Sequence, residues 1–335
     1  MIEKINNEIT APRHVRTKQS DIENTLPPVS VLLGDKEQYL QYVDLDGQPQ
    51  KLAFRGLAAH DPWPIPMPID RENYGSVESS ANYWSTGYGD WLNVSEALER
   101  YVEPEQTDRK LRLLDFGCAT GRFLRHAWIF GGEKIDCWGC DFATANINWM
   151  KRHLPSDIKT VLNTDIPHLP FPDGYFDICT AFSVMTHIDA MEDAWLLELR
   201  RVTNPNGLLY LTIQNEATWT KVADRPGSLD HLMRANLVPG NLEISEEVVR
   251  NEMPQDRIAL RMSREDTYNC NVWHSNDYVR QNWSRYFEIL HIADNGHTKY
   301  QSPCIMKPIS YAKKVAEPQD RSSQEKRSLK NLFLR

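Results

Sequence analysis

Two acids and two glycines near the middle of the chain have the types and spacing of a nucleoside-binding site. Asp115 ends an apolar run and is followed by Gly117 and Gly121. Glycine at such positions permits a tight turn and a close approach of the ligand to the backbone. Asp141 follows about 20 residues later, where a carboxylate accepts hydrogen bonds from ribose hydroxyls. Asp115 would repel a diphosphate but suits an ammonium group. An N-cap of the next helix is the structural alternative for Asp141.

A strand, a turn and a helix are needed to position these residues. The apolar run from Leu111 predicts a strand, and the spacing of Phe123, Leu124 and Trp128 predicts a helix after the turn. The helix should end at the glycine pair 131–132, and a second strand should close on Asp141. The G-x-x-x-G spacing differs from the G-x-G-x-x-G that seats a pyrophosphate. This order predicts a parallel sheet with the ligand over its carboxyl edge.

Two segments resemble the class I S-adenosylmethionine-dependent methyltransferases. The sequence DFGCATG (115–121) is similar to their motif I, an acid, a variable residue and G-x-G-x-G, with Ala119 in place of the middle glycine. The sequence LPFPDGYFDICTAFSVMTHI (169–188) resembles the small-molecule members of the ubiquinone, sterol and sugar type. It lacks the Asn/Asp-Pro-Pro-aromatic tetrad of enzymes that methylate base or glutamine amino groups. The resemblance therefore implies a small-molecule methyltransferase.

The fold implied is α/β, with a Rossmann-like seven-stranded mostly parallel sheet whose last strand is antiparallel, plus an N-terminal extension and an inserted lid. Asp46-Gly47 predicts the turn of an accessory hairpin, and residues 272–275 are expected to open a late helix with Ser275 as its N-cap. The expected divisions are 1–70, arm and hairpin; 71–106, helical lid segment; 107–215, cofactor-binding core; 216–272, inserted acceptor lid; 273–312, closing helix and hairpin; and 313–335, polar tail.

The resemblance also implies S-adenosylmethionine as cofactor, S-adenosylhomocysteine as product, and no metal. Asp165 is expected to contact the adenine amino group. The expected cofactor contacts are Asp115, Gly117, Cys118, Ala119, Gly121, Asp141, Phe142, Asp165, Ile166, Ser183, Tyr83 and Tyr88. The expected acceptor contacts are Trp84, Met185, Trp219 and Trp273. Packing in the core is the alternative for the aromatic residues 83, 84 and 88.

Histidines are the candidates for a catalytic base, because an alcohol acceptor needs one near neutral pH, whereas a carboxylate needs none. The candidates are His187, His274 and His231, and a structural role at a helix start is the alternative for His187. Three arginines of the expected lid (257, 261 and 264) could grip an anionic acceptor or lie on a solvated surface.

Composition sets limits on partners and compartment. A hydrophobic content of 41% and a charged content of 25% are ordinary for a globular protein, and no apolar stretch approaches the roughly 18 residues of a spanning helix. The net charge of −8 gives no general attraction to nucleic acid. Six cysteines without an export signal indicate reduced thiols in a cytoplasm. Cys137 and Cys140 lie in an expected strand and point to opposite faces, which disfavours a metal site.

The sequence therefore predicts a cytoplasmic S-adenosylmethionine-dependent methyltransferase that O-methylates a small molecule, either a sugar or glycan precursor or a secondary metabolite. Neither nucleic acid nor an integral membrane association is expected, and a homo-oligomer is left open. N- or carboxyl-methylation of another small molecule remains an alternative, as does a catalytically inactive relative that serves as a binding or scaffold subunit. An NAD-dependent oxidoreductase is disfavoured by the glycine spacing.

Overall fold

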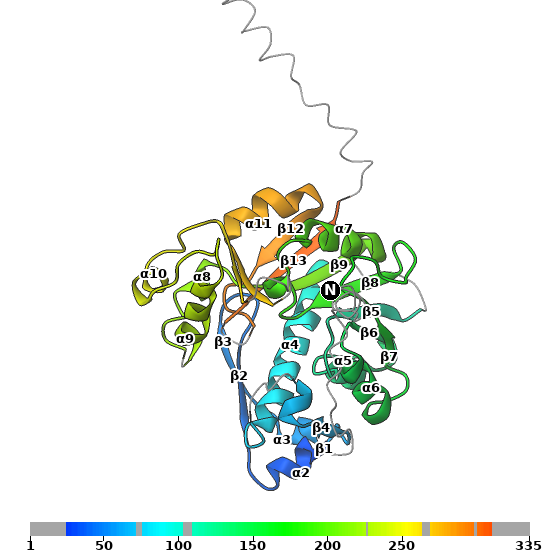
Figure 1. The fold of residues 1–335 in the computed structure, drawn as a ribbon. Coiled ribbons are helices and arrows are strands. Elements are labelled where there is room, and N and C mark those ends of the chain that lie inside the picture. The colour runs from blue at the N-terminus through cyan, green and yellow to red at the C-terminus, as the bar shows by residue number, and fades with distance from the viewer. Residues whose placement is uncertain are drawn as a thin grey trace, which may run out of the picture.

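The structure is a computed structural model that describes residues 25–71, 76–102, 109–225, 227–262, 269–297 and 300–309. Within these ranges the centre is a seven-stranded sheet of order β12-β13-β9-β8-β5-β6-β7 (Figure 1). Its strands are β5 (Leu111–Phe116), β6 (Ile135–Asp141), β7 (Lys159–Leu162), β8 (Phe176–Ala181), β9 (Thr203–Ile213), β12 (Phe287–Ile292) and β13 (Ser302–Pro308). Strands β7, β6, β5, β8 and β9 pair in parallel, and β13 runs antiparallel to both β9 and β12. The predicted mostly parallel sheet with an antiparallel last strand is confirmed.

Helices cover both faces of this sheet. Neighbouring strand residues point to opposite faces, so Leu113 and Leu114 of β5 belong to two different hydrophobic clusters. Helices α4 (Ser80–Tyr101), α5 (Leu124–Gly131) and α6 (Thr144–His153) supply the first cluster. Helices α7 (Glu192–Val202) and α11 (Asn276–Asn282) supply the second. The result is a three-layer α/β/α body.

Helix ends agree with two of the sequence signals. Helix α5 ends at Gly132, whose φ of 54° lies in the left-handed region that glycine tolerates. The Ser275 hydroxyl accepts a hydrogen bond from the Tyr278 backbone N–H, as predicted for the cap of α11. Short 3₁₀ turns link other elements: η2 (Gly132–Lys134), η3 (Met185–His187) and η5 (Trp283–Arg285).

The N-terminal part wraps around α4 and α5. Its elements are β1 (Thr25–Pro28), α2 (Val29–Leu33), β2 (Tyr39–Val43), β3 (Pro49–Ala53), α3 (Arg55–Ala58), β4 (Pro64–Pro66) and η1 (Pro68–Arg71). The predicted hairpin is present as the antiparallel pair β2–β3. The proline-rich segment between α3 and η1 docks on α5, where the fully buried Arg125 donates hydrogen bonds to Asp61 and to the carbonyls of Trp63 and Pro64.

The insertion after β9 forms a lobe with a core of its own. Its elements are α8 (Glu216–Trp219), α9 (Ser228–Met233), η4 (Arg234–Leu237), α10 (Glu246–Arg250), β10 (Arg257–Arg261) and β11 (Cys270–His274). The helix begins at Asn276, directly after its predicted N-cap Ser275, but the strand just ahead of it was not expected: Trp273 pairs with Ile258 across β10 and β11. This pairing is favoured because it buries Trp273 in the core of the lobe, against β10 residues such as Ile258.

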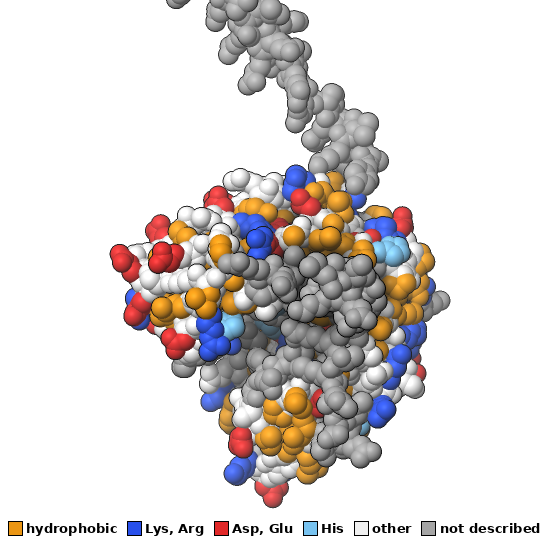
Figure 2. Space-filling view, viewed as in Figure 1, with side chains coloured by type: hydrophobic (Ala, Val, Ile, Leu, Met, Phe, Trp, Pro, Cys, Tyr) orange, Lys and Arg blue, Asp and Glu red, His pale blue; other side chains and the backbone are white. Residues whose placement is uncertain are grey.

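Several expectations concern residues outside the described ranges: residues 1–24 of the arm, Arg264 and the 313–335 tail. Among the described helices none is long and apolar enough to cross a membrane. On the face shown in Figure 2, and outside the grey atoms, Lys and Arg lie scattered among Asp and Glu and do not gather into one basic patch.

Candidate functional site

The carboxyl ends of β5 and β6 are joined by the glycine turn. Gly117 and Gly121 have φ values of 72° and 77°, and a Cβ on Gly117 would lie 2.5 Å from Val184 Cγ2. The backbone N–H groups of Gly117 and Cys118 both donate to the carbonyl of Cys140, at 2.9 and 3.0 Å. The turn is thus fixed against the end of β6, and both glycines are required by their backbone conformation.

Asp141 organises this turn from the neighbouring strand. Its Oδ2 accepts a 2.9 Å bond from the Ala119 N–H, and its Oδ1 accepts a 2.7 Å bond from the Ala143 N–H. Ala119 has φ 46°, so this bond holds a non-glycine residue in the left-handed region. Ala143, not Asp141, occupies the N-cap position of α6. A carboxylate oxygen accepts more than one hydrogen bond, so these contacts are compatible with ribose hydroxyls as further donors.

Asp115 is a buried acid with few compensating contacts. Its side chain is 3% exposed, and Oδ1 accepts a 2.8 Å hydrogen bond from the Thr180 hydroxyl. Burial raises the pKa of Asp115 to about 7; the Thr180 bond and the charge of Arg122 oppose this, while the charges of Asp90 and Asp141 add to it. A cation placed beside Asp115 would restore its ionised form, which is the chemistry of an ammonium-binding site.

The end of β7 supplies a group that sequence reasoning missed. Asn163 is 8% exposed and donates its N–H to the carbonyl of Asp141, while its Oδ1 is buried without a partner among the described residues. Such an orphaned acceptor suits a ligand amino or hydroxyl donor. Asp165 and Phe142 are half-buried, and the side chain of Ile166 is 63% exposed. The sequence did contain a signal for Asn163: it directly follows strand β7, just as Asp141 is the last residue of strand β6.

The end of β8 carries a polar turn. Ser183 has φ 60°, its N–H donates to the Thr212 hydroxyl, and its Oγ accepts from the Gln301 side chain, both at 2.7 Å. Gln301 Oε1 in turn accepts from Thr212. Ser183 therefore lies just beyond the end of β8, the strand that pairs with β5, whereas Met185, an expected acceptor contact, is fully buried in the second hydrophobic cluster.

The three aromatic residues expected from α4 occupy different environments. The Tyr83 hydroxyl lies 3.0 Å from the hydroxyl of Thr120 and so touches the glycine turn. Trp84 has no exposed surface and donates its indole N–H to Asp61 at 2.7 Å. Tyr88 is stacked on Trp84 and packs on Phe130. The packing alternative describes Trp84 and Tyr88, while Tyr83 reaches the candidate site.

The three candidate histidines do not converge. His187 donates from Nδ1 to the carbonyl of Cys270 at 2.7 Å, since a carbonyl only accepts, so Nε2 is its basic nitrogen. The ring of His274 has no exposed surface, and its Nε2 bonds to Glu192 at 3.0 Å. An acceptor cannot reach His274 in this conformation. His231 lies on the exposed surface of α9.

The tryptophans and arginines of the insertion have structural partners. Trp219 and Trp273 meet edge to face in the core of the lobe and are 0% and 3% exposed, so they present no face to an acceptor. Arg257 bonds to Glu192 and Asp189, and Arg261 to Asp189. These bonds connect the lobe to the start of α7 and to the segment just before it.

A second cluster, formed by Asp90, Arg122 and His297, was not expected. Asp90 Oδ1 accepts a 2.5 Å bond from His297 Nδ1, and its Oδ2 lies 2.6 Å from Arg122 Nη1. Against burial, Arg122 and His297 hold the pKa of Asp90 below its ordinary value. Asp90 and His297 are 207 residues apart, so no local pattern could have joined them.

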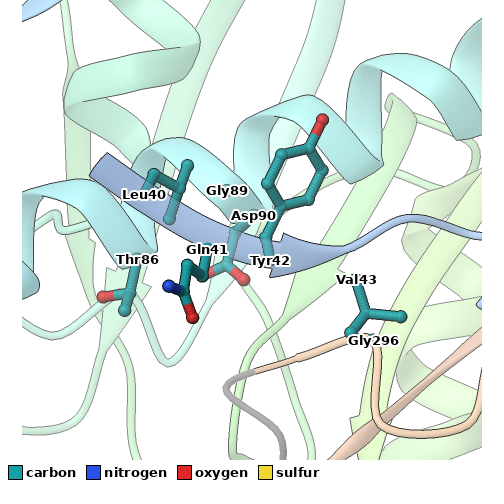
Figure 3. A pocket seen from close by; sticks show the side chains of 8 residues that line it. All are labelled: Leu40, Gln41, Tyr42, Val43, Thr86, Gly89, Asp90 and Gly296. Carbon is teal, nitrogen blue, oxygen red and sulfur yellow. The ribbon is translucent and has the colours of Figure 1, made fainter. Parts of the chain in front are cut away.

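Strand β2 covers the outer side of Asp90. Figure 3 shows β2 lying across α4, with Gln41 and Thr86 beside Asp90. The space left there is only about 30 Å³, lined by Leu40, Gln41, Tyr42, Val43, Thr86, Gly89, Asp90 and Gly296. That is room for about one water molecule, so the Asp90 carboxylate is shielded from bulk solvent on this side.

Comparison with known proteins agrees with this geometry. The family described as "Methyltransferase domain" matches residues 114–211, which run from β5 to β9 and include the glycine turn and Asp141. Residues 114–211 of this chain are therefore a methyltransferase domain.

Relatives of the methyltransferase domain are named for more than one reaction. Malonyl-[acyl-carrier protein] O-methyltransferase of Yersinia pestis is 28% identical over 184 residues, which are 53% of this chain and 62% of that protein. The ubiquinone/menaquinone biosynthesis C-methyltransferase of Burkholderia cenocepacia is 36% identical over 101 residues, 29% of this chain and 40% of that protein. The crystal structure of an S-adenosylmethionine-dependent methyltransferase from Mesorhizobium loti has a TM-score of 0.44 and 13% identity, covering 65% of this chain and 97% of that one. The chain thus spans less than two thirds of these two sequence relatives.

Proposed function

We propose that this chain transfers a methyl group from S-adenosylmethionine to a small-molecule hydroxyl acceptor, a sugar or glycan precursor or a secondary metabolite. The observation that carries the proposal is the juxtaposition of Asp115 and Asp141 at the ends of adjacent strands, on either side of the glycine turn. Two acids and a tight turn suit a ligand with one ammonium group, one ribose and no diphosphate.

In this proposal each acid has a separate task. Asp141 accepts hydrogen bonds from the ribose hydroxyls, and Asp115 accepts the amino group of the methionine part. Asn163 and Asp165 receive the adenine amino group, with Phe142 and Ile166 against the ring. The turn (117–121), together with Tyr83 and Ser183, lines the remainder of the cofactor. When bound, S-adenosylmethionine supplies a methyl group already activated on a sulfonium.

The residues of the chain then have to align the acceptor and exclude water. The N-terminal hairpin and α4 close one side of the sheet edge, and the inserted lobe stands at the ends of β8 and β9 (Figure 1). An acceptor entering between them would meet the polar turn at Ser183. N- or carboxyl-methylation of another small molecule remains the second candidate, because the named relatives differ in the atom they methylate.

Calorimetry tests the proposal. S-adenosylmethionine and S-adenosylhomocysteine should bind and NAD should not. Asp141→Ala should weaken binding by about 2–3 kcal/mol, the scale of hydrogen bonds to a charged group. Asp165→Ala should have a smaller effect. NAD binding, or an Asp141→Ala protein of unchanged affinity, would reject the assignment. Binding without turnover on any acceptor would instead identify an inactive relative.

A further inference from the structure

The cluster of Asp90 and His297 lies beside the residues proposed to hold the cofactor. The His297 ring packs 5.4 Å, centroid to centroid, from Phe182, the first residue after β8. Arg122, which follows the second glycine of the turn, bonds to Asp90 and lies 5.9 Å from the centre of the same Phe182 ring. The charge of Asp90 also acts on Asp115. The cluster therefore borders the edge of β5 and β8, where a reacting methyl group would lie.

Backbone contacts fix the position of His297. His297 and Gln301 exchange backbone hydrogen bonds, both at 3.0 Å, and the Gln301 side chain bonds to Ser183. The Asn93 side chain, one turn of α4 beyond Asp90, donates to the carbonyls of Gly296 and Val43 at 3.0 Å. The imidazole is thus tied to α4 on one side and to the end of β8 on the other.

The hydrogen bonds also determine which nitrogen is basic. A carboxylate only accepts, so the 2.5 Å contact with Asp90 places the proton on His297 Nδ1. The neutral ring then carries its lone pair on Nε2, which forms no hydrogen bond among the described residues. A carboxylate behind Nδ1 both orients the ring and stabilises the imidazolium that forms when Nε2 takes a proton.

We propose that His297, positioned by Asp90, is the general base that deprotonates a neutral hydroxyl acceptor at this site. The inference rests on the proposed function. It narrows the acceptor to alcohols and phenols, because a carboxylate is already ionised and gains nothing from a base. His297 is the catalytic residue and Asp90 a positioning residue.

The methyl transfer needs no reactant besides the acceptor, the methyl donor and water. The hydroxyl proton passes to His297 Nε2, and the electron pair of the oxygen forms the new O–C bond. The electron pair of the broken C–S bond remains on the departing sulfur. His297 then releases its proton to water. The charged and titratable groups facing the dyad are Arg122 on the glycine turn, Asp115 beyond it, and Tyr210 on β9.

The decisive variant is His297→Asn. The asparagine amide nitrogen takes the place of Nδ1 and can still donate to Asp90, whereas no nitrogen remains at Nε2. His168→Asn is the matched control, because that ring is 76% exposed and lies before β8 on the surface. Wild type and variants are incubated with methyl-labelled S-adenosylmethionine and phenol, catechol, methyl glucoside, monomethyl malonate and a metabolite extract. Products are identified by mass spectrometry, and S-adenosylhomocysteine affinity is measured by calorimetry.

We expect label on a hydroxyl oxygen, a loss of about 10²–10⁴-fold in turnover for His297→Asn, and no loss for His168→Asn. Cofactor affinity should change less than about twofold, far below that catalytic loss. In Asp90→Asn the rate should fall, and the acidic limb of its pH profile should move to lower pH, because the imidazole loses a neighbouring negative charge. Equal turnover of His297→Asn and wild type, or a wild type that binds the cofactor but labels no hydroxyl compound, overturns the inference. Absence of cofactor binding in the wild type would instead reject the proposed function.

Discussion

Asp115→Asn is expected to stabilise the ligand-free protein while strongly weakening cofactor binding. Burial of the Asp115 carboxyl raises its pKa from 3.8 to about 7 in the folded protein. The folded chain therefore holds a proton between pH 4 and pH 7 that the unfolded chain has lost, so stability falls as pH rises through this window. One pKa unit corresponds to about 1.4 kcal/mol, so the ionised Asp115 costs about 4 kcal/mol at pH 8. Asparagine keeps the shape and the hydrogen bond to Thr180 without this cost.

Urea denaturation at pH 5 and pH 8 measures the effect. Between these two values the wild type should lose about 3 kcal/mol of unfolding free energy relative to Asp115→Asn, since roughly two pKa units of the shift lie in this interval. Groups that do not interact with Asp115 titrate equally in both proteins and cancel in the difference. Asp157→Asn, at an exposed position, is the control and should show no such pH-dependent difference.

The same acid should link cofactor binding to proton release. An ammonium group beside Asp115 lowers its pKa, so binding at pH 7 should release about half a proton, visible as a dependence of the calorimetric heat on the buffer. Asp115→Asn should bind S-adenosylhomocysteine much more weakly and release no proton there. A stability difference that does not vary with pH, or a variant that binds as tightly as the wild type, would refute the assignment of Asp115.

Three further substitutions test other parts of the structure. Arg125→Met should cost about 3–5 kcal/mol in urea denaturation because it removes the counter-charge of the fully buried Asp61. Adding Asp61→Asn should recover part of that loss, and additive losses would contradict this. Against burial, His274, Arg257 and Trp283 lower the pKa of Glu192 to about 2. Glu192→Gln should therefore cost about 3 kcal/mol at pH 7, and the difference from wild type should shrink as pH falls from 4.5 towards 2. A pH-independent difference would count against this assignment. Gly117→Ala should weaken cofactor binding measured by calorimetry, because its Cβ would meet Val184 and its φ is positive; unchanged affinity would show that the turn relaxes.

The sheet and the position of Asp115 and Asp141 at its carboxyl edge could be predicted because each signal is local. Asp115 and Asp141 each end an apolar strand, and adjacent parallel strands place their carboxyl ends together whatever packs on the faces. Gly132 and Ser275 are recognisable for the same reason, since a helix end depends on the few residues around it. At these positions the sequence alone determined the outcome.

Which side chains face an acceptor was decided only by the tertiary structure. The sequence predicted that Trp219 and Trp273 contact the acceptor, but both side chains are buried in the hydrophobic core of the inserted lobe. His274 is similarly withdrawn from solvent by Glu192. Asp90 and His297 are in contact because α4, which carries Asp90, packs against the connection between β12 and β13, which carries His297. Contacts between residues 207 positions apart depend on how whole elements pack, and no periodicity or spacing along the chain encodes that packing.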